Sequence, residues 1–251
     1  MTIDINCDMG ESFGAYKIGN DQDIFPYISS CNVACGAHGG DPLHIDRTLR
    51  LAVKFGVRIG AHPGYPDLQG FGRRPMQMSD RELNASIRYQ VSALAGMAKS
   101  VGGEISYVKP HGALYNTACS DETVCKAIVD AIRNIDPHLS LMGLAGSQMG
   151  EIAQREGISF IAEAFADRAY EDNGLLRSRS MTGAVHSDPA LACDQVISIA
   201  TRNEVITFEG STFHLEADSF CIHGDNPAAL SILKELENKM SQNGLERAKW
   251  K

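Results

Sequence analysis

The stretch Ile105-Ser-Tyr-Val-Lys-Pro-His-Gly112 joins a short apolar run to a polar turn that contains proline and glycine. The same unit recurs along the chain, and a segment with helical character follows most of these turns. Short apolar runs bounded by glycine, proline or asparagine are typical of buried strands. The pattern predicts strands at 3–7, 32–35, 57–61, 105–108, 139–144, 158–163, 205–208 and 219–222.

Helix-start signals separate these strands. Asp41-Pro42 and Asn226-Pro227 each place a capping side chain before a proline suited to the first helical turn, and Ser79 with Glu82 fits a capping box. Alternating strands and helices predict parallel strands joined by βαβ crossovers. We therefore predict one α/β domain over residues 1–251, a TIM-like (β/α) barrel of seven or eight strands. An open doubly wound sheet is the alternative, although no G-x-G-x-x-G motif follows the first strand.

The composition is that of an ordinary globular protein, with 43% apolar and 22% charged residues. A net charge of −8 argues against nucleic acid or an acidic membrane as a partner. The apolar runs are too short to span a bilayer, and the first residues lack the pattern of a secretory signal. The seven cysteines show no paired spacing, which is typical of reduced thiols. We expect a cytoplasmic protein, and the sequence leaves a homo-oligomer open.

Polar side chains follow the predicted strands directly, at their carboxyl ends. In a β/α barrel these ends converge on one mouth, where the active site lies. Histidines that fall in such turns, each followed by glycine or proline, are His38, His62, His111 and His223. Carboxylates that share the rim are Asp8, Glu11, Asp41, Asp167 and Asp225. A rim carboxylate can orient an imidazole or act as a base on water, and helix capping is the alternative for Asp41 and Asp225.

Cationic side chains also lie at the predicted mouth. Lys109 emerges from a buried strand, where it suits an anionic substrate or a developing oxyanion, or else an ion pair with a rim carboxylate. Arg73 and Arg74 lie in a glycine-rich loop, where they can bind a carboxylate or phosphate or simply face solvent. Histidine and aspartate at a barrel mouth can also bind zinc or another divalent metal ion, so residue types leave the metal content open. No P-loop, G-x-S-x-G or H-E-x-x-H motif occurs.

Taken together, these features resemble the LamB/YcsF family, over residues 4 to about 236. The segments that carry the resemblance are NCDMGESFG (6–14), NVACGAHGGDP (32–42), GAHPGYPD (60–67), GFGRR (70–74), VKPHGALYN (108–116), EAFADRAY (163–170) and CIHGDNP (221–227). The resemblance implies a barrel similar to the glycoside hydrolase/deacetylase group. The H-x-x-x-H metal pair of the deacetylases is missing, so their metal site does not carry over.

The resemblance also implies an activity. It is that of a hydrolase acting on a cyclic amide, the ATP-dependent opening of 5-oxo-L-proline to L-glutamate. ATP would be a cosubstrate of the assembled enzyme, and 5-oxoprolinase subunits B and C would be the partners. We expect activity only in that complex. The alternatives are a stand-alone metal-dependent amidohydrolase or sugar deacetylase, and a non-catalytic ligand-binding subunit.

Site roles follow from the positions that match the family's segments. The catalytic candidates are Asp8, His38, Lys109, His111, Asp167 and His223. The substrate-binding candidates are Asn6, Glu11, Asp41, His62, Arg73, Arg168, Arg179 and Asp225. Lys109 and Arg168 suit charge stabilisation, and His111 or Asp8 suits proton transfer. Because Ser178 stands where the resemblance predicts a proline, Arg177 competes with Arg179 for the same role.

Overall fold

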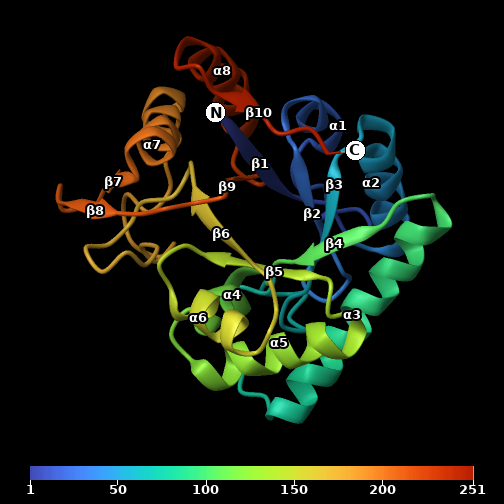
Figure 1. The fold of residues 1–251 in the computed structure, drawn as a ribbon. Helices are drawn as coiled ribbons and strands as arrows, with labels where there is room; N and C mark the ends of the chain where they lie inside the picture. The colour runs from blue at the N-terminus through green and yellow to red at the C-terminus, as the bar shows by residue number, and fades with distance from the viewer. Residues whose placement is uncertain (251) are drawn as a thin grey trace.

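The structure, a computed structural model, describes residues 1–250, and Lys251 at the end of the predicted domain lies outside the described residues. Parallel strands form a barrel (Figure 1) in the order β1, β2, β3, β4, β5, β6 and β9. They are β1 (Thr2–Met9), β2 (Ser30–Ala34), β3 (Arg58–His62), β4 (Ile105–Val108), β5 (Ser140–Leu144), β6 (Phe160–Phe165) and β9 (Ser219–His223). Since β9 pairs back onto β1, the sheet is closed, and the predicted TIM-like barrel is confirmed with seven strands within the described chain.

Helices connect the strands and cover the outside of the barrel (Figure 1). The helical elements are α1 (Asp21–Ile24), the 3-10 helix η1 (Phe25–Tyr27), α2 (Pro42–Phe55), α3 (Asp80–Ser100), α4 (Gly112–Ala118), α5 (Glu122–Ile135), α6 (Gln148–Arg155), α7 (Pro189–Arg202) and α8 (Ala229–Gln242). Helix α3 packs against α5, and α7 packs against α8. This outer layer leaves the carboxyl ends of the strands to the βα loops, which build the mouth of the barrel.

Two predicted helix starts are confirmed. Asp41 is the N-cap of α2, and its side chain accepts hydrogen bonds from the amides of Leu43 and His44 at 2.9 and 3.1 Å. Ser79 caps α3 in a reciprocal capping box with Glu82. These caps satisfy amides that the helix itself cannot pair.

The helix start predicted at Asn226-Pro227 is misplaced, because α8 begins only at Ala229. The side-chain oxygen of Asn226 accepts from the Ala228 amide at 3.0 Å and so holds a turn ahead of the helix. Its side-chain amide donates to Asp167 Oδ2 at 3.0 Å. Asn226 therefore connects this turn to the mouth of the barrel.

The strand predicted at 205–208 is not a barrel strand. Its residues form β7 (Glu204–Ile206), which pairs antiparallel with β8 (Thr212–His214) in a separate two-stranded sheet. Val205 is buried, but Ile206 is 57% exposed, so the run has only one buried face. Gly210 adopts a positive φ of 88° in the turn and lets the chain reverse at once. A tight hairpin thus replaces a crossover, and the chain returns to the barrel through β9.

A continuous apolar core lies between the strands and the helices. Every residue of β2 and β9 is buried, as is all of β1 except Thr2. All seven cysteines are buried and free, as expected for reduced thiols. None of the helices in the described residues combines the length and apolarity that crossing a membrane requires. The last short strand, β10 (Glu246–Arg247), pairs in parallel with the start of β1.

Candidate active site

The carboxyl ends of the barrel strands surround a cavity of about 510 Å³. This volume lies in the range of small-molecule sites. The predicted site residues that line the cavity are Asp8, His62, Arg73, Lys109, His111, Arg168, Arg179 and His223. The prediction that side chains after different strands meet at one mouth is therefore confirmed for these residues.

Lys109 lies at the floor of the cavity and is almost fully buried. Its Nζ donates to Asp8 Oδ1 at 2.9 Å and lies 2.7 Å from Glu163 Oε1. Burial alone would lower the pKa of Lys109, but the two carboxylates outweigh burial and raise this pKa well above its usual value. Lys109 is therefore a fixed cation, and the ion-pair alternative raised by the sequence is present in the structure.

Glu163 is a site residue for which the sequence yielded no role. It lies in β6 with no solvent exposure, and its Oε2 accepts from the Tyr115 hydroxyl at 2.8 Å. The Cys221 thiol, 3.1 Å from Lys109 Nζ, was also missed. A carboxylate inside an otherwise apolar strand was the available signal, because such a group is buried only with a partner.

His223 and Asp167 form a buried pair beside Asp8 and Cys221. Asp167 Oδ1 lies 2.7 Å from His223 Nδ1, and Asp167 Oδ2 accepts from the His223 amide at 3.2 Å. Burial opposes the charge on Asp167, but interaction with His223 and Asn226 holds the pKa of Asp167 below its usual value. The carboxylate thus fixes the ring so that Nε2 is left to face the cavity, an arrangement that suits proton transfer.

Arginines supply positive charge around the mouth. Arg168 is 4% exposed and donates to the carbonyls of Ala184 and Arg177, and its guanidinium makes no ion pair with any described carboxylate. Burial, followed by the nearby Arg179, lowers the pKa of Arg168, although the group stays charged at neutral pH. Arg73 pairs with Asp225 at the rim. An anionic ligand would therefore meet Arg168, a cation without an ion pair among the described residues, beside the Arg73–Asp225 pair.

Arg177 and Arg179, the two candidates for the substrate-binding arginine, differ in their contacts. Arg177 pairs with Glu171 at 2.9 Å, donates to the Thr182 carbonyl and stacks on the ring of Phe208. Arg179 is 29% exposed and has only a distant contact of 3.9 Å to Asp225. Arg177 is thus committed to holding its loop, whereas Arg179 is free to meet a ligand.

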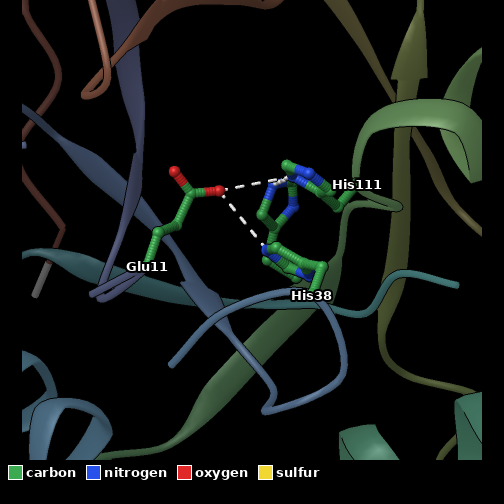
Figure 2. Close-up of side chains that lie close together, drawn as sticks. Glu11, His38 and His111 are labelled. Atoms are coloured by element: carbon green, nitrogen blue, oxygen red, sulfur yellow. Dashed lines mark hydrogen bonds and ion pairs between the residues drawn. The ribbon is translucent and has the colours of Figure 1, made fainter. Parts of the chain in front are cut away.

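A cluster of one carboxylate and three imidazoles lies beside the lysine. We call Glu11, His38, His62 and His111 the histidine cluster; all four are buried, and ligand atoms of the four lie within 4.8 Å of one another. Figure 2 shows one carboxylate oxygen of Glu11 facing the rings of both His38 and His111, each 3.3 Å away. The His38 and His111 rings are stacked with centroids 3.6 Å apart. Burial lowers the pKa of both rings well below the usual value and raises the pKa of Glu11.

A strained loop covers the histidine cluster. Phe71 has a positive φ of 55°, which is uncommon for a residue with a side chain, and its carbonyl accepts from His111 Nε2 at 2.8 Å. A Cβ on the next residue, Gly72, would lie 2.7 Å from the Cβ of His38. Glycine is therefore needed where this loop approaches the cluster.

Two predicted residues take supporting positions. Asn6 lies beneath the floor, where its Oδ1 is 3.4 Å from Lys109 Nζ and its amide donates to Ser219 at 2.8 Å. Asp41 does not line the cavity, because its carboxylate is engaged by the first amides of α2 and by the Gly14 amide at 2.7 Å. These backbone hydrogen bonds, with that of Gly14 first, hold the pKa of Asp41 below its usual value.

The fold and this cavity define a seven-stranded parallel β/α-barrel protein with a buried cationic site at the barrel mouth. The LamB/YcsF family profile matches residues 3–251, and the chain belongs to this family. It is 48% identical over 246 residues to the A subunit of 5-oxoprolinase from Acinetobacter baylyi, covering 98% of this chain and 97% of that one.

Solved structures agree with this family and fold. The crystal structure of a lactam utilization protein from Thermus thermophilus is 41% identical, covers 100% of both chains and superimposes with a TM-score of 0.93. A family 4 carbohydrate esterase from Streptomyces lividans is only 9% identical, covers 98% of this chain and 91% of that one, and has a TM-score of 0.52. The second likeness shows the fold alone, a β/α barrel of the kind that the resemblance implied.

Proposed function

We propose that this chain is the A subunit of an ATP-dependent 5-oxoprolinase, which opens 5-oxo-L-proline to L-glutamate together with subunits B and C. Relatives that are named as the A subunit of 5-oxoprolinase support the reaction, and the lactam utilization protein supports a lactam substrate. The observation that carries the proposal is a single cavity with a buried ammonium at its floor and arginines at its mouth. That arrangement matches a small ligand with a carboxylate and an amide oxygen.

Charge stabilisation falls to Lys109. The five-membered amide is unstrained, so its hydrolysis is slow, and transfer of a phosphoryl group from ATP to the lactam oxygen would activate the ring carbon. Negative charge then develops on oxygen at that carbon and on the transferred group. A fixed cation in a buried site stabilises such charge without reorganisation. Lys109 meets this need, since Asp8 and Glu163 keep it protonated.

Proton transfer falls to His223. Water that adds to the activated carbon must lose a proton, and the ring nitrogen must gain one as the C–N bond breaks. A second water then hydrolyses the acyl phosphate that remains, which releases phosphate and gives the side-chain carboxylate of glutamate. His223 lines the cavity, and Asp167 holds its Nδ1, so Nε2 is the atom that exchanges protons with the reactants. This division of roles is that of a histidine base oriented by a carboxylate.

The substrate carboxylate is assigned to Arg168 and Arg179. Arg168 is a buried cation without an ion pair among the described residues, and Arg179 reaches the same cavity from a partly exposed position. A guanidinium binds a carboxylate through two parallel hydrogen bonds, which fixes the orientation of the ligand. Anchoring at the mouth would place the lactam oxygen toward Lys109 at the floor.

The test is reconstitution. Glutamate release from 5-oxo-L-proline is measured for the chain alone, for subunits B and C alone and for the full mixture, each with and without ATP. The proposal predicts release only in the full mixture with ATP. Release by the chain alone without ATP would contradict it and support the metal-dependent amidohydrolase. A mixture made with His214→Gln is the matched control, because His214 is an exposed histidine on β8 outside the cavity lining.

A further inference from the structure

In the histidine cluster, one ring nitrogen of His62 and one of His111 each hydrogen-bond to a backbone carbonyl. His62 Nδ1 lies 2.7 Å from the Lys109 carbonyl, and His111 Nε2 lies 2.8 Å from the Phe71 carbonyl. A carbonyl only accepts, so both of these nitrogens carry the proton. In the neutral rings the lone pairs are then on His62 Nε2 and His111 Nδ1. These two atoms face each other at 3.0 Å.

The other two members of the cluster have buried polar atoms without a hydrogen bond. Glu11 Oε1 lies 3.3 Å from His38 Nε2, but neither atom forms a hydrogen bond in the structure, and His38 Nδ1 forms none either. His38 is 1% exposed and Glu11 is 5% exposed, so bulk water does not satisfy them. Leaving such groups unpaired is costly, and native proteins do so rarely.

We propose that Glu11, His38, His62 and His111 bind one divalent transition-metal ion through Glu11 Oε1, His38 Nε2, His62 Nε2 and His111 Nδ1. Three of the contacts between these atoms measure 3.0, 3.3 and 3.3 Å. Because the rings of His38 and His111 are stacked in parallel, binding requires one of them to turn so that both nitrogens face the ion. Two ligands about 2.1 Å from a shared zinc ion at the tetrahedral angle would lie about 3.4 Å apart. Imidazole and carboxylate donors suit zinc and similar borderline cations. The backbone hydrogen bonds of His62 and His111 are the outer contacts that commonly orient metal-binding histidines.

Protons are the alternative to a metal ion in the histidine cluster. A proton on His62 Nε2 would explain its approach to Asp8 Oδ2 at 3.3 Å. A second proton on Glu11, whose pKa burial raises, would place a donor 3.3 Å from His38 Nε2. His38 Nδ1 has no hydrogen-bond partner in either case, and the metal titration below distinguishes the two arrangements. A cation among the four ligand atoms satisfies the opposed lone pairs and the orphaned oxygen together.

A second group of potential ligands in the described chain does not carry the same inference. Asp8, Cys221 and His223 also lie close together. However, Lys109 Nζ is 2.9 Å from Asp8 and 3.1 Å from Cys221, so an ammonium already supplies the positive charge there. The histidine cluster has no such internal cation.

The proposed ion lies next to the cavity and outside the lactam chemistry assigned to Lys109 and His223. His62 and His111 line the cavity, whereas Glu11 and His38 lie behind them. When bound, the ion would supply fixed positive charge at this wall. Metal binding by the isolated chain can therefore be measured without any turnover, so its failure and a failure of the proposed function are distinguishable.

The first experiment uses the unsubstituted full chain. Metal-free protein is titrated with Zn²⁺ and, separately, with Co²⁺, and bound metal is counted by mass spectrometry after gel filtration. X-ray absorption at the zinc edge then reports the number of imidazole ligands. The proposal predicts one ion per chain with three imidazoles. Absence of stoichiometric binding at saturating Zn²⁺ and Co²⁺, or a site with fewer than three imidazoles, would overturn it.

Substitutions locate the site. Glu11→Gln, His62→Gln and His111→Gln should each weaken Zn²⁺ binding by more than about a hundredfold, beyond the loss typical of an outer-shell partner. The control is His214→Gln, which should bind Zn²⁺ as the unsubstituted chain does. Circular dichroism reports whether each variant is folded. Folded cluster variants that keep full affinity for Zn²⁺ would overturn the proposal. If a variant does not fold, the number of imidazole ligands from X-ray absorption on the unsubstituted chain tests the site instead.

Discussion

Lys109, which directly follows strand β4, and Glu163 of strand β6 meet inside the barrel with Nζ 2.7 Å from Oε1. Asp8 of β1 approaches the same ammonium from another side at 2.9 Å. One buried cation therefore separates two buried carboxylates, and the three strands are linked across the barrel. This network fixes the charge at the floor of the cavity before any ligand enters.

Removing the lysine should be costly for stability. Lys109→Met leaves two carboxylates buried without their cation, and we expect a loss of about 3–5 kcal/mol in the free energy of unfolding. The double variant Lys109→Met with Glu163→Gln should recover part of that loss, because one uncompensated charge is gone. Urea denaturation of both variants measures the difference. A double variant less stable than Lys109→Met would contradict the network.

The two neighbouring arginines should behave differently. Arg179→Gln should raise KM for 5-oxo-L-proline in the assembled enzyme by roughly tenfold or more, since one charge-assisted hydrogen bond is lost. Its stability should stay within about 0.5 kcal/mol of the unsubstituted chain. Arg177→Gln should instead lower stability, because Arg177 holds Glu171 and the Phe208 ring. Steady-state kinetics measure KM and thermal melts measure stability for both variants. If Arg177→Gln raised KM and Arg179→Gln lowered stability, Arg177 would be the ligand-binding arginine.

The Asp167–His223 pair should be needed for turnover more than for binding. Asp167→Asn keeps the size of the side chain but removes the charge that orients the ring. We expect kcat in the assembled enzyme to fall about a hundredfold or more with little change in KM. His223→Gln should show the same split between kcat and KM. An unchanged kcat in either folded variant would remove His223 from proton transfer.

Asp41 should act on stability in a pH-dependent way. Its hydrogen bonds with Gly14 and the first turn of α2 hold its pKa low in the folded state, so the unfolded state binds the proton first as the pH falls. The stabilisation is therefore present above the unfolded pKa of about 3.9 and is lost on further acidification. Asp41→Ala should cost about 1 kcal/mol at neutral pH, and the difference from the unsubstituted chain should shrink below about pH 4. Urea denaturation at a series of pH values measures it; a difference that does not change with pH would refute the assignment.

The sequence predicted the barrel because its signals are local. Apolar runs followed by glycine-containing turns marked the barrel strands, and a capping side chain with proline marked the start of α2. The run at 205–208 misled the prediction, because its short length and turn fit a hairpin as well as a barrel strand. Which of the two forms depends on what covers each face, and that is a tertiary property.

The sequence predicted that the candidate residues lie at one mouth, but it did not predict which of them contact one another. Placing Lys109 and the four turn histidines at one mouth required only strand ends and parallel topology. Pairing Lys109 with Glu163, or His111 with Glu11, depends on side chains that meet across the barrel from distant parts of the chain. No spacing rule connects such residues, so the histidine cluster was not recognisable as a unit before the fold was known.

We propose that 5-oxo-L-proline is opened at the floor of this cavity. The most direct measurement is ATP-dependent glutamate release by subunits B and C assembled with either Glu163→Gln or the double variant Lys109→Met with Glu163→Gln. The first variant keeps the ammonium, and the second lacks it. The account predicts that the double variant is about a hundredfold slower than Glu163→Gln, because the charge on the reacting oxygen loses its stabilising cation. Equal turnover by the two folded variants would contradict the account.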